Sequence, residues 1–148
     1  MSAWLYYFYH VMSFSKTAWG PDYPECYNVT CHGEELVYLF GSVDLAAIQL
    51  GENISYTASE KDLVVNVEDS WLNFINGNSP QPNWEPIGNS TLSSWLFSTP
   101  DSPMHVASSP IDFPRSEKCD FFDRIGYGPA QRFMTKLVEY GFRMRTTK

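Results

Sequence analysis

The sequence has no long apolar run and few basic residues, and both shortages narrow the classes of protein to which it can belong. Its longest apolar run, residues 4–9, is far shorter than the ~20 residues that a membrane-spanning helix requires, so we predict no transmembrane segment. The 10 Lys and Arg residues are outnumbered by 17 Asp and Glu residues, which gives a net charge of −7. An acidic protein repels the phosphate backbone, so we predict no binding of nucleic acid.

The few basic residues are concentrated at the C-terminal end. Residues 129–148 hold five of the ten, against the single acid Glu139, so this stretch carries a charge of +4 and the remainder carries −11. We interpret residues 129–148 as a basic amphipathic tail that follows the main portion, residues 1–128. The tail is short and mixed with Phe and Tyr, so it does not change the prediction about nucleic acid.

Cysteine is also scarce, with three residues in the whole chain. Cys26 and Cys31 enclose a short loop and predict a disulfide worth about 2 kcal/mol, whereas Cys119 has no evident partner. N-glycosylation sequons occur at Asn28, Asn53 and Asn89. Disulfides and N-glycans both belong to oxidising compartments, so we predict a secreted or extracellular protein. The alternative is a cytosolic protein with three reduced thiols.

One strand and one helix stand out in the local patterns. Residues 4–12 are rich in aromatic residues, and apolar residues occupy both odd and even positions. This pattern is typical of a strand buried on both faces of a mostly parallel sheet. Residues 57–77 begin with the capping-box pair Thr57 and Glu60, carry an apolar stripe and end at Gly77, which predicts a helix. Residues 34–40 fit a strand and a helix equally well.

The remaining sequence is dominated by loops. Residues 13–30 predict a loop that leaves the end of the strand, and residues 76–115 hold seven of the ten prolines. Weaker patterns indicate short strands at residues 95–97 and 104–107, and helices at residues 119–125 and 131–142. These elements are too few to form a two-layer domain in which helices cover the sheet. We therefore expect the chain to depend on further sequence or a partner.

A specific signature occurs between Cys31 and Gly41, where the chain reads CHGEELVYLFG. It resembles the HG-x-E-(I/L)-x-(F/Y)-(V/L)-F-G signature around the catalytic histidine of type-B carboxylesterases and cholinesterases. Further landmarks follow the order of that family, and the resemblance covers residues 4–125. These landmarks are the strand-like residues 5–10, the helix end with Trp71, Asn73, Phe74, Gly77 and Pro80, then Trp84, and Cys119 with Phe121 and Phe122.

The resemblance implies an α/β fold, the C-terminal part of an α/β-hydrolase with an incomplete sheet, a catalytic-histidine loop, packing helices and long Pro-rich loops. In that family a serine on a strand-to-helix elbow attacks a small-molecule carboxylic ester, with the triad in the order serine, acid, histidine. His32 would be the general base and acid of that triad. Glu35 matches a glutamate of the signature, and we expect it to orient the loop. No cofactor is implied.

The other two triad members have no match in the sequence. It contains neither a G-x-S-x-G elbow nor a Gly-rich oxyanion segment. Asp22 and Glu25 precede His32 closely, but they do not match the position of the acid in the family. We therefore expect the 148 residues alone to be inactive and to require an N-terminal portion of the fold, which would also carry the secretion signal.

Two other interpretations remain open. Neuroligin-like members of the superfamily keep a similar histidine segment without the serine, and they act as adhesion modules rather than enzymes. The residue at the elbow position would separate this alternative from an esterase. A zinc site is the second alternative, although adjacent Cys31 and His32 point apart in most backbone conformations. Its ligands would be Cys26, Cys31, His32 and Cys119. We interpret His10 and His105 as structural residues.

Overall fold

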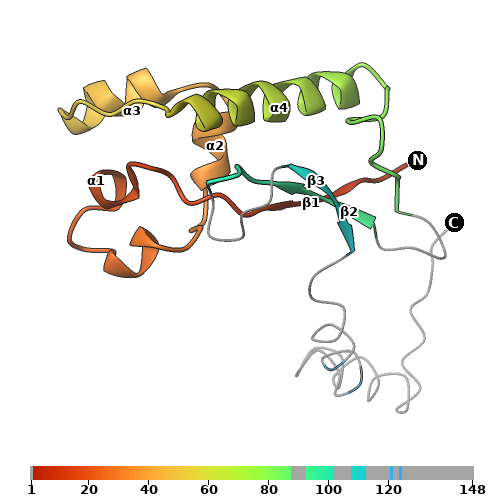
Figure 1. Ribbon diagram of the computed structural model, residues 1–148, viewed down its shortest axis with the longest axis horizontal. Coiled ribbons are helices and arrows are strands. Elements are labelled where there is room, and N and C mark those ends of the chain that lie inside the picture. The colour runs from red at the N-terminus through yellow and green to blue at the C-terminus, as the bar shows by residue number, and fades with distance from the viewer. Residues whose placement is uncertain (1, 88–92, 102–107, 113–120, 122–123, 125–148) are drawn as a thin grey trace, which may run out of the picture. The chain divides into compact units, whose positions relative to one another are not determined.

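The computed structural model describes residues 2–87, 93–101 and 108–112, together with residues 121 and 124 (Figure 1). The chain divides into two compact units, Met1–Asp112 and Phe113–Lys148. In the second unit Phe121 and Arg124 are helical. The described residues do not include the expected tail at residues 129–148, the boundary at residue 128, or the elements expected at residues 104–107 and 131–142.

The first unit contains a mixed three-stranded sheet in the order β1-β2-β3. The strands are β1 (Leu5–Phe8), β2 (Ser93–Phe97) and β3 (Ser109–Asp112). β1 runs parallel to β2, with Leu5 opposite Ser94, whereas β3 is antiparallel to β2. Because parallel neighbours need a crossover connection, the helices of this unit lie in the chain between β1 and β2.

The buried strand is β2 rather than β1. Every described side chain of β2 is buried, on both faces of the strand: Ser94, Trp95, Leu96 and Phe97. The side chains of β1 are half-buried or exposed, and Tyr6 is 37% exposed, so the prediction that this strand is buried on both faces was wrong. The physical reason is position, because β1 has a strand on one side only among the residues that the structure describes.

The helices follow the local signals in the sequence. They are α1 (Ser15–Trp19), the 3-10 turn η1 (Pro24–Tyr27), α2 (Glu34–Leu39), α3 (Val43–Leu50) and α4 (Ala58–Ile75). The predicted capping box is present, since the Thr57 side chain accepts from the Glu60 amide and the Glu60 side chain accepts from the Thr57 amide. Residues 34–39, which fitted either structure, form a helix with two acids in its first turn, where the helix dipole favours negative charge.

The core lies between α4 and the sheet, and Figure 1 shows α3 and α4 along one side of the strands, with α2 between α4 and the level of the strands. Its buried side chains come mainly from these helices and strands and from the segment that follows α4, and they include Tyr38, Leu63, Val67, Trp84 and Phe97. Other large apolar side chains of α3 and α4 are exposed: Leu45, Ile48, Leu50, Val65, Leu72, Phe74 and Ile75. Among the described helices none is both long enough and apolar enough to cross a membrane.

Candidate functional site

His32 lies in the turn between η1 and α2, and its imidazole is exposed to solvent. The next residue, Gly33, has a φ of 85°, a left-handed conformation that favours glycine and lets α2 begin directly after the turn. Within the described part of the chain, the imidazole forms no hydrogen bond or ion pair. The nearby carboxylates of Asp22 and Glu25 therefore do not orient the ring, in agreement with their mismatch to the acid position.

A disulfide fixes the chain immediately before His32. Cys26, at the end of η1, is bonded to Cys31, and their Cα atoms are 5.6 Å apart, which confirms the pairing predicted from the sequence. The bond also removes both thiolates from the proposed zinc site, so that alternative is wrong. No other group of three or more His, Cys, Asp or Glu side chains suited to a metal occurs among the residues described.

Glu34 fixes the turn on the other side of His32. Its side chain is 2% exposed, and its Oε1 accepts a hydrogen bond of 2.7 Å from Nε1 of Trp19 at the end of α1. Burial raises the pKa of this carboxyl, and the bond from the indole opposes that rise. The sequence pattern drew attention to Glu35, but it is Glu34 that ties the turn to another element.

Glu35 itself is half-buried on α2. Burial raises the pKa of Tyr6 in β1, and the charge of Glu35 adds to that rise. Its expected role in orienting the loop stays a prediction.

The far end of α2 is held by a buried network centred on Glu60. The Oε1 atom of Glu60 accepts from the Tyr38 hydroxyl at 2.8 Å and from the Ser13 amide at 2.8 Å, and lies 2.9 Å from His10 Nε2. Its Oε2 atom accepts from the Ser13 hydroxyl at 2.7 Å and from the Thr57 amide at 2.8 Å. One carboxylate thus joins α2, α4 and the segment that follows β1.

The electrostatics of this network favour a charged Glu60. Burial alone would raise the pKa of Glu60, but the hydrogen bonds from His10, Ser13 and Thr57 outweigh it and hold the pKa well below its usual range. Burial and the adjacent Glu60 charge both raise the pKa of Tyr38, so its hydroxyl remains a donor. On the other side of the ring, His10 Nδ1 lies 3.2 Å from the Thr99 hydroxyl, beyond the end of β2.

These contacts define a turn that is anchored on both sides while its imidazole stays free. The sequence pattern pointed to His32 and to the disulfide. It did not reveal the bond between Glu34 and Trp19, or that Glu60 centres a buried network in addition to capping α4. The sequons at Asn28 and Asn53 are exposed, as glycosylation requires. Asn89, His105 and Cys119 lie outside the described residues.

In a comparison with protein families, the model described as "Carboxylesterase family" matches residues 1–122. The matched region contains His32, the disulfide, the Glu60 network and the whole described sheet. No curated protein matches the chain.

Proposed function

Because the chain belongs to the carboxylesterase family, we propose that His32 is the acid–base histidine of a serine ester hydrolase. The observation that carries the proposal is an exposed imidazole on a turn that is fixed by a disulfide before it and by Glu34 after it. A group that transfers protons must keep its position while remaining accessible to substrate, and this arrangement meets both needs.

In the proposed reaction His32 takes the proton of a serine hydroxyl as the serine attacks the ester carbonyl. It then returns that proton to the oxygen of the departing alcohol. An imidazole suits this exchange because its ordinary pKa lies close to neutral pH. A carboxylate on the opposite ring nitrogen would hold the ring in the productive orientation.

We propose that the serine and the carboxylate come from sequence outside residues 1–148. No G-x-S-x-G elbow occurs in the chain, and no described carboxylate bonds to His32. β1 is the outer strand of the described sheet, which supports this proposal, because a further strand of an α/β-hydrolase sheet would lie beside it. The exposed apolar side chains of α3 and α4 also support it, because such a surface is usually covered by another part of a protein.

The expected substrate is a small-molecule carboxylic ester, and the expected location is secreted or extracellular. The Cys26–Cys31 disulfide is compatible with an oxidising compartment, and the exposure of Asn28 and Asn53 is compatible with glycans at both. Tryptic mass mapping before and after removal of N-glycans from the natural protein would test both sites.

The decisive experiment measures hydrolysis of a p-nitrophenyl ester by a protein that joins residues 1–148 to the upstream part of its transcript. We expect His32→Gln to lower kcat by about a thousandfold or more, since the triad acts as a unit. Asp22→Asn changes an exposed carboxylate in the turn before η1 and should leave kcat unchanged. Full activity in the His32→Gln protein would refute the proposal, and an elbow without serine would favour the adhesion alternative.

A further inference from the structure

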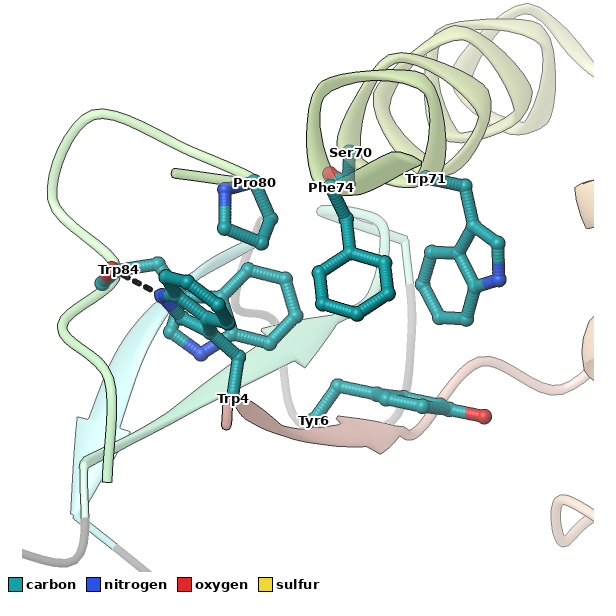
Figure 2. Close-up of a pocket in the computed structure, with 7 residues that line it drawn as sticks. All are labelled: Trp4, Tyr6, Ser70, Trp71, Phe74, Pro80 and Trp84. Atoms are coloured by element: carbon teal, nitrogen blue, oxygen red, sulfur yellow. Dashed lines mark hydrogen bonds between the residues drawn. The ribbon is translucent and has the colours of Figure 1, made fainter. Parts of the chain in front are cut away.

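An aromatic pocket lies between β1, the C-terminal end of α4 and the segment that follows α4 (Figure 2). Its volume is about 180 Å³, and it includes none of the residues that surround His32. The pocket is lined by Trp4, Tyr6, Ser70, Trp71, Phe74, Pro80 and Trp84. Trp71, Phe74, Pro80 and Trp84 are landmarks of the sequence that the proposed ester hydrolysis leaves without a function.

The polar atoms of the lining are already bonded or face elsewhere. The indole N–H of Trp4 donates to the Trp84 carbonyl at 3.1 Å, and that of Trp84 donates to the Leu5 carbonyl at 3.0 Å. The Ser70 hydroxyl donates to a backbone carbonyl of α4 and accepts from a glutamine amide. Figure 2 shows the Tyr6 hydroxyl and the Trp71 indole nitrogen pointing away from Trp4, so the pocket presents rings and CH groups.

The walls are held in place by contacts between rings. Trp4 meets Phe74 edge to face at 5.9 Å, and Tyr6 meets Trp71 in the same way at 4.9 Å. Trp84 stacks on a tryptophan of β2 at 5.8 Å. Because aromatic pairs prefer such geometries, the pocket is formed before any ligand arrives.

Exposure differs between the floor and the mouth of the pocket. Trp84 and Ser70 are 3% and 0% exposed at the floor, whereas Phe74 is 52% exposed at the mouth. An occupant would therefore contact a fixed apolar floor and cover a half-exposed ring, and both contacts remove apolar surface from water.

We propose that this pocket binds a small neutral apolar group of about the size of a benzene ring. An enclosed apolar cavity of roughly 150 Å³ holds benzene, so a pocket of about 180 Å³ is large enough for such a group. No lining side chain carries a charge, so a cation could gain only contacts with ring faces, and the edge-to-face pairs Trp4–Phe74 and Tyr6–Trp71 already occupy faces that such contacts need. The inference does not depend on the role of His32.

The test uses the protein that joins residues 1–148 to the upstream part of its transcript, with two probes, toluene and the tetramethylammonium cation, titrated by ligand-observed NMR. We expect toluene to bind and the cation not to bind, with intermolecular NOEs from toluene to the Phe74 and Trp84 rings. Phe74→Ala should raise the Kd for toluene about tenfold, because one aromatic wall is lost. Leu72→Ala is the matched control, since Leu72 is 56% exposed on the same helix but does not line the pocket.

Three results would overturn the proposal. The first is preferential binding of the cation. The second is the absence of toluene binding, as expected if another part of the protein or a second copy fills the pocket. The third is equal loss of affinity in both variants, or toluene NOEs to other rings, which would indicate nonspecific uptake by exposed apolar surface. NOEs in the unaltered chain keep the test decisive even if a variant fails to fold.

Discussion

Replacing Glu60 with glutamine tests the physical basis of the turn that carries His32. The substitution keeps the shape of the side chain but removes its charge and turns one acceptor into a donor. At the position of Oε2 the new amide group would face the Thr57 N–H, and two donors would then oppose each other. The bonds from Tyr38 and Ser13 to Oε1 would lose the contribution of the charged acceptor.

The expected cost follows from these contacts. Each hydrogen bond to a charged group contributes roughly 1.5–3 kcal/mol, and the substitution weakens several such bonds at once. We therefore expect Glu60→Gln to lower local stability by about 3 kcal/mol, which corresponds to a roughly 150-fold faster exchange of the amides in α2 and α4.

Hydrogen exchange with mass spectrometry is the suitable assay, because it reports α2 and α4 separately and does not require a global unfolding transition. The matched control is Glu68→Gln, the same chemical change on the same helix, at a side chain without a hydrogen bond to another described residue. Equal protection in the Glu60→Gln and Glu68→Gln proteins would refute the reasoning.

The pH dependence has a definite sign. The pKa of Glu60 is lower in the folded chain than its ordinary value, so the folded state favours the ionised form. Its contribution to stability is complete above the ordinary glutamate pKa of about 4.3 and is lost progressively as the pH falls below that value. After correction for intrinsic rates, protection should decline below that pH in the unaltered chain, and less so in Glu60→Gln. The same acid sensitivity in both proteins would contradict this assignment.

Three further predictions concern the whole chain. The 148 residues alone should not hydrolyse p-nitrophenyl esters; turnover that His32→Ala abolishes would contradict the expectation that the nucleophile lies elsewhere. The isolated chain should bind a hydrophobic dye and aggregate, because α3 and α4 expose apolar side chains, whereas a monodisperse sample with cooperative unfolding would contradict this. Reducing the Cys26–Cys31 disulfide should destabilise the turn by about 2 kcal/mol, seen as faster exchange in residues 26–34 but unchanged exchange in α4.

The sequence predicted those features that depend on residues close to one another in the chain. The capping box of α4 depends on residues three apart, and the disulfide depends on residues five apart, so both could be identified from spacing. The same Glu60 also bonds to His10, which lies 50 residues away, and no spacing rule links residues at that separation.

Other features depended on neighbours that composition does not reveal. The aromatic residues of β1 suggested burial on both faces, but burial depends on the strands beside it, and β2 occupies the enclosed position. Glu34 and Glu35 are adjacent on a helix and point in different directions, so only the packing of α2 shows that Glu34 is the buried one.

The parallel pairing of β1 with β2 also bears on how the chain is synthesised. His10 and Thr99, at the ends of these strands, are 89 residues apart, so β1 leaves the ribosome long before its partner exists. At about 5–20 residues per second, its tyrosine and phenylalanine side chains stay without this partner for roughly 5–20 s, a period in which exposed apolar side chains favour binding by chaperones. Contacts of such high sequence separation also slow folding, so newly made chains are the most vulnerable to misassembly before β2 emerges.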